Sequence, residues 1–440
     1  MWKFSKYSFS LRSPILLVLV SLCVYLMIWL LTTFGTKTCP CWPLKIWATL
    51  PGVAGYYLFS ISLLLSTRWR KLEDWFGGLD QIYHLHRKFG IWGFCLILLH
   101  PWVEAFKWLP NRLEKFILFV LPVHGRLSVN LGSYAYWLML LILGITLLRI
   151  LPYNKWKILH KFMSLVFLLA SFHIILSDKR VGSEFAQSML YLPMCIGFLG
   201  IFYKQIYIPF FAKYSSFEVT NVKNINDNIV EVILSPKKEH LRFIPGQYGF
   251  FTFYGPSLTT ESHPFTLIES TVDSTISLLV KARGDYTINL YRHIKKGDTC
   301  TCEGPYGRFN YNTQAGVSQI WIAGGIGVVP FLCWIRTMKR TFSQRMKIDF
   351  YYCIHKEADA VFYREFEEFS KAYPDFRIFL FCSEKGNKLD IHKIIDFSGN
   401  ISSKQVFMCG PQKLTSDFKA QFRACGISNE NIFVEDFEFF

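Results

Sequence analysis

The feature that most constrains this chain is a series of apolar segments in its first half, each close to the length that a bilayer requires. Runs of roughly 20 mainly apolar residues are typical of membrane-spanning helices. We expect six spans, at 14–33, 48–66, 83–102, 129–151, 156–176 and 189–211. The first run is long and has no small-residue cleavage pattern, which argues against a cleaved signal peptide. After residue 212 apolar and polar residues alternate as in a globular domain, so the chain divides into a membrane half and a soluble half.

The distribution of basic residues indicates how these spans are oriented. An even number of spans places both termini on one side, and that side would carry twelve Lys and Arg residues near the spans, against eight on the other. Because basic residues are favoured on the cytoplasmic side, we expect a multi-pass protein of the cell membrane with cytoplasmic soluble domains. The net charge of +16 suits anionic lipid and nucleotide phosphates. Nucleic acid is not an expected partner, because the basic residues are scattered around the spans.

Two spans carry histidines at matching separations. His86 and His100 are fourteen residues apart in the third span, which corresponds to about 21 Å of helix rise and about 40° of rotation. His160 and His173 are thirteen residues apart in the fifth span, which corresponds to about 19.5 Å of rise. Ionisable residues inside a membrane are costly and point to a function. Each span therefore offers one imidazole near each membrane surface.

Because both spans run in the same direction, His86 would meet His160 at the inner level and His100 would meet His173 at the outer level. Two imidazoles at each level would hold one b-type haem, a ligation that suits electron transfer. Any one of these residues alone would be more simply a hydrogen-bonded interior histidine. Thirteen residues also rotate the fifth-span pair apart by about 140°, so that span must be tilted or distorted. We treat His84 as an interfacial residue.

The soluble half changes character near residue 315. Short strands at 217–222, 229–234, 248–253, 265–268 and 276–280 are separated by turn residues, a pattern typical of an antiparallel barrel. From about 316 a strand, a glycine-rich turn and a helix recur, which indicates a parallel nucleotide-binding sheet. The segment Gly324-Gly325-Ile326-Gly327 ends a buried strand before a helix. Glycines there permit close backbone approach, and the helix start offers N–H groups to a pyrophosphate.

Four motifs accompany this turn: His263-Pro264-Phe265-Thr266, Lys281 to Thr287, Gly304-Pro305-Tyr306-Gly307 and Cys409-Gly410-Pro411. In this order they resemble the FAD and NAD(P)H module of the ferredoxin reductases. Together with the paired histidines, nearly the whole chain resembles the ferric reductase and NADPH oxidase superfamily. The resemblance implies a six-helix transmembrane haem domain at 1–213, an antiparallel FAD-binding β-barrel at 214–314 and an α/β NAD(P)H-binding domain at 315–440.

The resemblance also implies roles for individual residues. The flavin ring would be lined by His263, Pro264, Phe265 and Thr266, with the Thr266 hydroxyl near the reactive edge. The FAD pyrophosphate would be held by Arg283, Gly284 and Thr287, with Lys281 beside them. The dinucleotide phosphates would be bound by Gly324, Gly325 and Gly327, and the nicotinamide site would be floored by Cys409, Gly410 and Pro411. At Val329 relatives commonly carry threonine, so one phosphate or ribose hydrogen bond is in question.

Two further expectations concern the nicotinamide. Relatives of this module place a C-terminal aromatic ring over the flavin, so Phe440, or Phe439 in the alternative register, would occupy the nicotinamide position and swing aside on binding. Lys356 or His355, after the second strand of the nucleotide domain, would contact a 2′-phosphate. These residues favour NADPH over NADH.

The expected reaction is hydride transfer from NAD(P)H to FAD, followed by single electrons through two haems. FAD is needed because nicotinamide delivers two electrons together and haem accepts one. Three acceptors stay open: a ferric iron chelate, dioxygen, or a partner protein or quinone supplied with electrons. The twelve cysteines include no C-x-x-C pair and are read as reduced packing residues. Cys39 and Cys41 flank Pro40, a spacing at which a disulfide would be strained.

Overall fold

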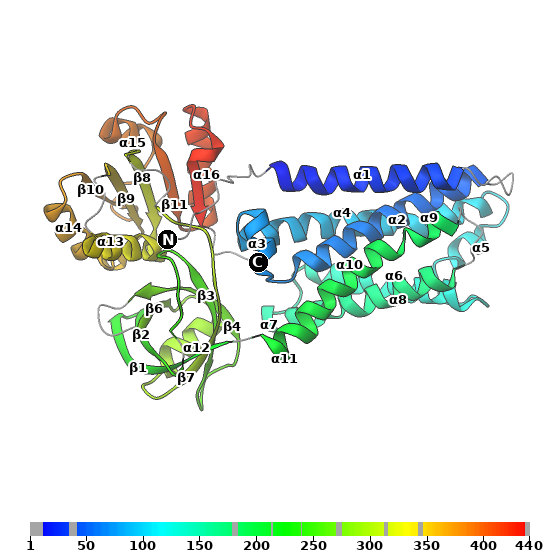
Figure 1. The fold of residues 1–440 in the computed structure, drawn as a ribbon, viewed down its shortest axis with the longest axis horizontal. Coiled ribbons are helices and arrows are strands. Elements are labelled where there is room, and N and C mark those ends of the chain that lie inside the picture. Colours follow the sequence, from blue (N-terminus) through cyan, green and yellow to red (C-terminus); the bar gives the residue numbers. More distant parts are fainter. Residues whose placement is uncertain are drawn as a thin grey trace. The chain divides into compact units, whose positions relative to one another are not determined.

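The computed structural model describes residues 12–34, 42–177, 184–212, 214–238, 240–269, 275–311, 316–341 and 346–435. They form two compact units, a helical one that holds most of the described residues before 213 and a mixed one that holds those after it (Figure 1).

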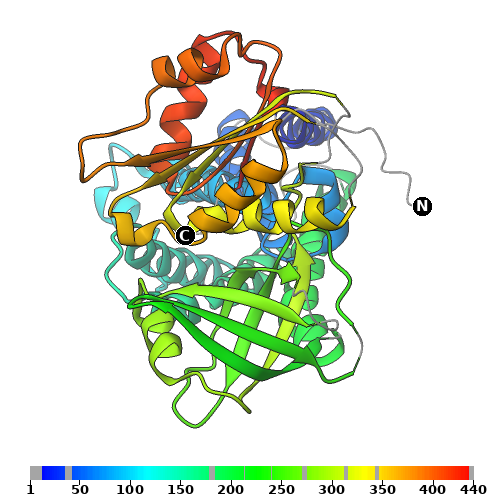
Figure 2. The ribbon, with the colours of Figure 1, turned by 90° about the vertical axis from the view of Figure 1, so that its left-hand side faces the viewer.

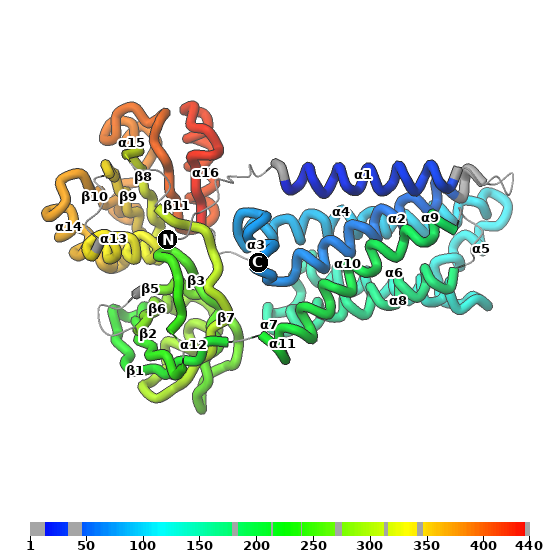
Figure 3. The backbone as a smooth tube through the Cα atoms, in the orientation of Figure 1, coloured from blue at the N-terminus to red at the C-terminus, as the bar shows by residue number. Residues whose placement is uncertain are grey.

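Six helical stretches in the described residues are long and apolar enough to cross a membrane. They are α1 (Arg12–Phe34), α2 (Trp42–Leu65), α4 (Leu79–Ala105), α6 (Leu127–Leu147), α7 (Tyr153–Lys161) with α8 (Met163–Leu176), and α9 (Glu184–Ser188) through α10 (Tyr191–Phe202), η2 (Tyr203–Tyr207) and α11 (Ile208–Phe211). Short helices α3 (Arg70–Phe76), η1 (Phe106–Trp108) and α5 (Leu113–Leu118) lie between them. All six predicted spans are confirmed. The tube view places α3 and α7 at one end of this bundle and α5 and α9 at the other (Figure 3).

The fifth span is interrupted at Phe162, between its two histidines. The Phe162 amide donates to the Leu159 carbonyl (3.0 Å), and the Leu165 amide donates to the Phe162 carbonyl (2.9 Å). Bonds of this three-residue spacing belong to a tighter turn, which rotates by about 120° per residue instead of about 100°. The extra rotation reduces the angular offset between His160 and His173. The structure therefore contains the distortion that the sequence required.

The centre of the bundle is packed with aromatic rings. Phe167 is fully buried and stacks on Tyr56, with ring centroids 4.9 Å apart. A Cβ at Gly197 would lie 2.2 Å from the Phe167 ring, so only glycine fits there. Gly93 similarly lies against the Gly55 backbone, where an added Cβ would come within 3.1 Å of the carbonyl oxygen. Phe167 and Gly93, both midway between the histidine levels, therefore pack helix against helix.

The first part of the soluble unit is an antiparallel sheet of seven strands in the order β4-β3-β7-β1-β2-β6-β5. The strands are β1 (Ser215–Asn226), β2 (Ile229–Pro236), β3 (Tyr248–Tyr254), β4 (Ser262–Thr266), β5 (Ile268–Glu269), β6 (Ile276–Lys281) and β7 (Thr299–Tyr306). Strand β7 was not predicted, because its residues Thr-Cys-Thr-Cys-Glu-Gly-Pro-Tyr carry a weak apolar signal. It pairs with both β1 and β3, and Cys300 and Cys302 supply its buried face.

The second part is a parallel five-stranded sheet in the order β10-β9-β8-β11-β12. Its strands are β8 (Gln319–Gly324), β9 (Ile348–Ile354), β10 (Phe376–Cys382), β11 (Gln405–Cys409) and β12 (Ile432–Glu435), and its main helices are α13 (Val329–Thr341), α14 (Tyr363–Ala372), α15 (Ile391–Ser398) and α16 (Gln412–Ala424). The order of connection reverses between β8 and β11. In open parallel sheets, ligands bind outside the carboxyl ends of the strands at such a reversal.

The barrel and the parallel sheet pack against each other within one unit (Figure 2). The Trp334 indole on α13 donates to the Pro245 carbonyl in the barrel (3.1 Å). The neighbouring Gly246 has a φ of +99°, and a Cβ there would lie 2.1 Å from the Phe309 carbonyl oxygen. The predicted architecture of bundle, antiparallel barrel and α/β sheet is confirmed.

Candidate functional site

The inner histidine pair joins α4 to α7. Nδ1 of His86 lies 2.7 Å from the Ser62 carbonyl oxygen of α2, to which it donates. The His86 and His160 rings lie edge to face, with centroids 6.3 Å apart and planes 81° apart. In a metal-bound imidazole, the ring centre lies about 3 Å from the metal, about 2 Å for the metal–nitrogen bond and about 1 Å from nitrogen to ring centre. Two imidazoles on opposite sides of one metal therefore have ring centres roughly 6 Å apart. The spacing of this pair therefore fits a shared haem iron.

His160 differs from the other three histidines. Its Nδ1 is buried and has no hydrogen-bond partner in the part of the chain that the structure describes. Coordination of a haem iron at Nε2 would not give this nitrogen a partner, so its burial stays unexplained. The fit to a haem rests on the two imidazoles and their spacing, which are the donor set that b-type haems use.

His100 of the outer pair rests in a notch on α2. Its Nδ1 donates to the Ala48 carbonyl (2.9 Å), which leaves Nε2 for coordination. Gly52, one turn further along α2, forms the floor of the notch, because a Cβ there would lie 2.9 Å from Nδ1. A hydrogen bond at one ring nitrogen fixes the orientation and tautomer of a ligating histidine.

His173 is held in the same way by α6. Its Nδ1 donates to the Ser128 carbonyl (2.7 Å), and a Cβ at Gly132 would lie 2.8 Å from that nitrogen. Sequence reasoning missed both glycines and both carbonyls. In both cases the glycine follows the residue whose carbonyl accepts the hydrogen bond by four positions. This spacing identifies a site for a histidine ring only once it is known which helices are neighbours.

The predicted flavin-lining residues His263, Pro264, Phe265 and Thr266 lie together on β4. The His263 ring stacks on Tyr286, with centroids 3.8 Å and planes 13° apart, and its Nε2 lies 3.1 Å from a Glu261 carboxylate oxygen. Burial, with a smaller contribution from Glu261, raises the pKa of the Tyr286 hydroxyl. Thr266, at the end of β4, is buried.

The expected pyrophosphate residues surround the start of α12 (Asp285–His293). The Thr287 hydroxyl oxygen accepts from the backbone amides of Arg283 (3.0 Å) and Gly284 (3.1 Å). This arrangement fixes Arg283 at a helix N-terminus, where a basic side chain and the helix dipole favour a phosphate. Lys281 instead directs its ammonium at Asp359, 3.3 Å away, and so ties the barrel to the parallel sheet.

The glycine-rich turn after β8 meets the end of β11 at the reversal point of the sheet. A Cβ at Gly327 would lie 2.3 Å from the Cys409 carbonyl oxygen, and one at Gly410 would lie 2.9 Å from the Gly324 Cα. Gly325 has a φ of +54°. The structure therefore brings together the two predicted nucleotide motifs, Gly324, Gly325 and Gly327 with Cys409, Gly410 and Pro411. Val329, in the first turn of α13, is buried in the hydrophobic core.

Lys356 and His355 follow β9, next to the glycine turn in the sheet order. The His355 Nδ1 lies 3.0 Å from the Ser383 hydroxyl oxygen. The Lys356 side chain is exposed, and its backbone amide donates to Asp359 (3.3 Å). Lys356 is therefore placed to meet a group at the carboxyl edge of the sheet. The C-terminal residues Phe439 and Phe440 lie outside the described residues.

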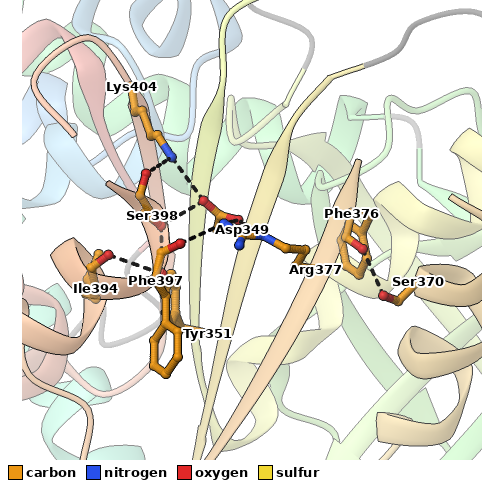
Figure 4. A network of polar contacts seen from close by, with 9 residues as sticks. All are labelled: Asp349, Tyr351, Ser370, Phe376, Arg377, Ile394, Phe397, Ser398 and Lys404. Atoms are coloured by element: carbon orange, nitrogen blue, oxygen red, sulfur yellow. Dashed lines mark hydrogen bonds and ion pairs between the residues drawn. The ribbon is translucent and has the colours of Figure 1, made fainter. Parts of the chain in front are cut away.

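A further polar network surrounds Asp349, at the amino ends of the parallel strands, opposite to the nucleotide motifs (Figure 4). The buried carboxylate accepts from Arg377 Nε (2.8 Å), Lys404 Nζ (3.0 Å) and the Ser398 hydroxyl (2.7 Å). These residues begin β9 and β10, precede β11 and end α15. The network joins four elements at the amino edge of the sheet, away from the nucleotide motifs.

Three cysteines of the soluble half, Cys300, Cys302 and Cys353, pack in its hydrophobic cores. Burial raises the pKa of the Cys353 thiol to about 12 and raises the pKa of Cys300 and Cys302 as well. Thiols with raised pKa values are poor nucleophiles. The described cysteines are all free thiols, whereas Cys39 and Cys41 lie outside the described residues.

Models of three protein families match successive parts of the chain. The ferric reductase like transmembrane component matches residues 51–171, the FAD-binding domain matches residues 214–316, and the oxidoreductase NAD-binding domain matches residues 321–420. The first match contains His86, His100 and His160 and ends two residues before His173, and the other two contain the flavin and nucleotide motifs.

The curated relatives that we compare match half of this chain or less. The reductase component of propane 2-monooxygenase from Rhodococcus jostii (strain RHA1) is 26% identical over 236 residues, covering 50% of this chain and 62% of the relative. NADH-cytochrome b5 reductase 1 from Dictyostelium discoideum is 26% identical over 184 residues, covering 39% and 63% respectively. This chain thus spans less than two thirds of the length of these relatives.

Among solved structures, a flavohemoglobin from Malassezia yamatoensis with bound FAD and heme gives a TM-score of 0.51 at 16% identity, covering 91% of this chain and 99% of that one. At this identity the likeness concerns the fold alone.

Proposed function

Since the chain has the domain architecture of the ferric reductase and NADPH oxidase superfamily, we propose that it carries electrons from NAD(P)H through FAD and two b-type haems to an acceptor across a membrane. The chain is an NAD(P)H-dependent oxidoreductase with a multi-pass membrane unit. We further propose two haems, electron flow from the cytoplasmic side to the far side, an acceptor there, and a place in the cell membrane with the soluble unit in the cytoplasm.

The observation that carries the proposal is the inner histidine pair. His86 and His160 come from spans far apart in the sequence, yet their ring centroids lie 6.3 Å apart. His86 is oriented by a backbone carbonyl, and Nδ1 of His160 is buried without a partner in the described chain. This spacing is the one expected for two imidazole ligands of one iron.

The soluble unit and the membrane unit bind different cofactors in this proposal. FAD held by the barrel would supply the conversion of a hydride, which carries two electrons, into single electrons, the form that haem accepts. The glycine turn and Cys409 to Pro411 hold the dinucleotide at the sheet reversal. Thr266 and His263 orient the flavin, and Arg283 and Thr287 hold its phosphates. The four membrane histidines fix two haems at two depths, with the bundle core excluding water from the region between them.

The acceptor is tested directly with purified protein and NADPH. Reduction of a ferric chelate under anaerobic conditions identifies a ferric reductase, and superoxide formation in air identifies an oxidase. Reduction of neither, with haems that NADPH reduces fully, supports the alternative of an electron-supplying module for a partner protein or quinone. Protein that binds FAD but contains no haem would refute the proposal itself.

A further inference from the structure

Three cations gather around one indole ring in the segment between α4 and α6. Lys115 Nζ lies 5.1 Å, Lys107 Nζ 5.8 Å and Arg112 Cζ 5.9 Å from the Trp108 ring centroid. Each contact is an attractive cation–π interaction. The three cations nevertheless repel one another, because like charges at short range raise the energy of the arrangement.

The surrounding sequence leaves much of this charge uncompensated. Residues 106–126 carry four basic residues, Lys107, Arg112, Lys115 and Arg126, and one carboxylate, Glu114. Lys107 pairs with Glu104 of α4 (2.7 Å). Within the described chain, no carboxylate lies at ion-pair distance from Arg112, Lys115 or Arg126. The cluster therefore favours an external anion.

Hydrogen bonds fix this segment to the bundle. The Trp102 indole of α4 donates to the Tyr136 hydroxyl of α6 (3.1 Å), and the Trp137 indole donates to the Val120 carbonyl (2.9 Å). Asn130 exchanges two hydrogen bonds with the His124 backbone, at 2.9 and 2.8 Å. The segment that carries the cluster is therefore fixed to α6.

These two helices also organise the outer histidine pair. His100 lies on α4, seven residues before Lys107, which corresponds to about 10 Å of helix rise. Ser128 and Gly132 of α6, which hold His173, follow the segment directly. Figure 1 places α5 at one end of the bundle and α7, which carries His160, at the other. The cluster therefore belongs to the end of the outer pair.

We propose that Lys107, Arg112, Lys115 and Trp108 bind the electron acceptor, and that this acceptor is an anionic ferric chelate with carboxylate ligands. Ammonium and guanidinium groups form strong hydrogen bonds with carboxylate oxygens. A hydrated ferric ion would be repelled by the cluster, and neutral dioxygen gains nothing from it. The inference rests on the proposed function and names its substrate class.

The first test uses a ferric citrate analogue that cannot be reduced. The haem-loaded protein is placed in bilayer discs of zwitterionic phosphatidylcholine and titrated with gallium(III) citrate by calorimetry. The unaltered protein should bind it, and the Arg112→Glu/Lys115→Glu variant should bind at least about tenfold more weakly, because two charge-assisted contacts are reversed. The Arg112→Gln/Lys115→Gln variant should lose less affinity. It serves as the second test if the reversed variant does not fold.

A matched control is Lys157→Glu, which removes a cation lying 5.7 Å from the Tyr153 ring on α7, at the other end of the bundle. It should leave gallium citrate binding unchanged. With ferric citrate as acceptor, the cluster variants should raise KM by the same factor as the dissociation constant, with kcat and haem spectra unaltered.

Absence of gallium citrate binding in the unaltered protein, or equal binding by the cluster variants, would overturn the proposal. Loss of gallium citrate binding when phosphatidylglycerol replaces phosphatidylcholine would show that lipid phosphates occupy the cluster. That result would also overturn the proposal. Protein without haem would refute the electron-transfer function, while gallium citrate binding would still report on the cluster.

Discussion

The membrane unit and the soluble unit position their candidate cofactor residues by different means. In the bundle, the groups are imidazole side chains, and His100 and His173 are each oriented by a backbone carbonyl and a glycine notch on a neighbouring helix. In the soluble unit, the nucleotide groups are backbone turns in which Gly327 and Gly410 touch other backbone atoms. The histidine sites of the membrane unit therefore depend on side-chain identity, and the nucleotide turns of the soluble unit depend on the absence of side chains.

The physical reason lies in the backbone hydrogen bonds. Within a membrane, helices satisfy their own amides and carbonyls, so ligands must come from side chains. At the carboxyl end of a parallel strand, the first amides of the following helix have no internal partner and suit phosphate oxygens. Substitutions in the two units should therefore have different effects. Those in the membrane unit should change the haem content, and those in the soluble unit should change nucleotide use or the stability of that unit.

The largest expected effect follows removal of a histidine. Alanine at His86 or His160 should eliminate the inner haem, and alanine at His100 or His173 the outer haem, with NAD(P)H-driven reduction of the acceptor lost in all four. The haem-to-protein ratio and the low-spin spectra measure this outcome. His84→Ala is the control and should keep both haems. Full haem content in all four variants would contradict the assignment.

A subtler change on α6 tests the glycine notch. Gly132→Ala places a Cβ 2.8 Å from the His173 ring and should displace it, with loss of most of the outer haem. Gly144→Ala on the same helix meets no atom within 4 Å and should keep the haem content unchanged. Absorption spectra of the two variants, prepared in parallel, measure the difference. Equal haem content in both would show that the notch does not position His173.

Asp349→Ala should destabilise the soluble unit by about 3 kcal/mol, because it leaves the Lys404 ammonium, whose side chain is 13% exposed, without its buried partner. Glu367→Ala removes an exposed carboxylate 3.7 Å from Lys371 and should cost at most about 0.5 kcal/mol. Denaturant unfolding followed by flavin fluorescence gives both free energies of unfolding. Haem spectra below the transition should be identical, and their loss would contradict the independence of the two units.

The smallest expected effect concerns the choice of nicotinamide. Lys356→Glu should lower the ratio of kcat/KM for NADPH to that for NADH by about tenfold, equivalent to about 1.4 kcal/mol, because a carboxylate repels the 2′-phosphate. Exposed Lys388→Glu, in the loop after β10, should leave this ratio unchanged. A higher kcat/KM for NADH in the unaltered protein would reverse the predicted preference.

The sequence by itself determined the architecture, because spans, strands and glycine turns are local patterns. The six apolar runs follow from the length of a bilayer, and the order from His263 to Pro411 follows from motif spacing. The missed element was β7, whose cysteines and Gly304-Pro305 carry no strong strand pattern. The boundaries at 213 and 314 and the role of Phe440 stay predictions.

Only the tertiary structure decided which backbone groups orient each histidine. Ala48 and Gly52 lie on α2, while Ser128 and Gly132 lie on α6, and no local pattern links them to His100 or His173. The same holds for the break at Phe162 and for the contact of Gly327 with Cys409, more than 80 residues away in the sequence. Hydrophobicity and turn propensity act between neighbours in the chain, whereas a notch for a ring or the meeting of two turns depends on how whole elements pack.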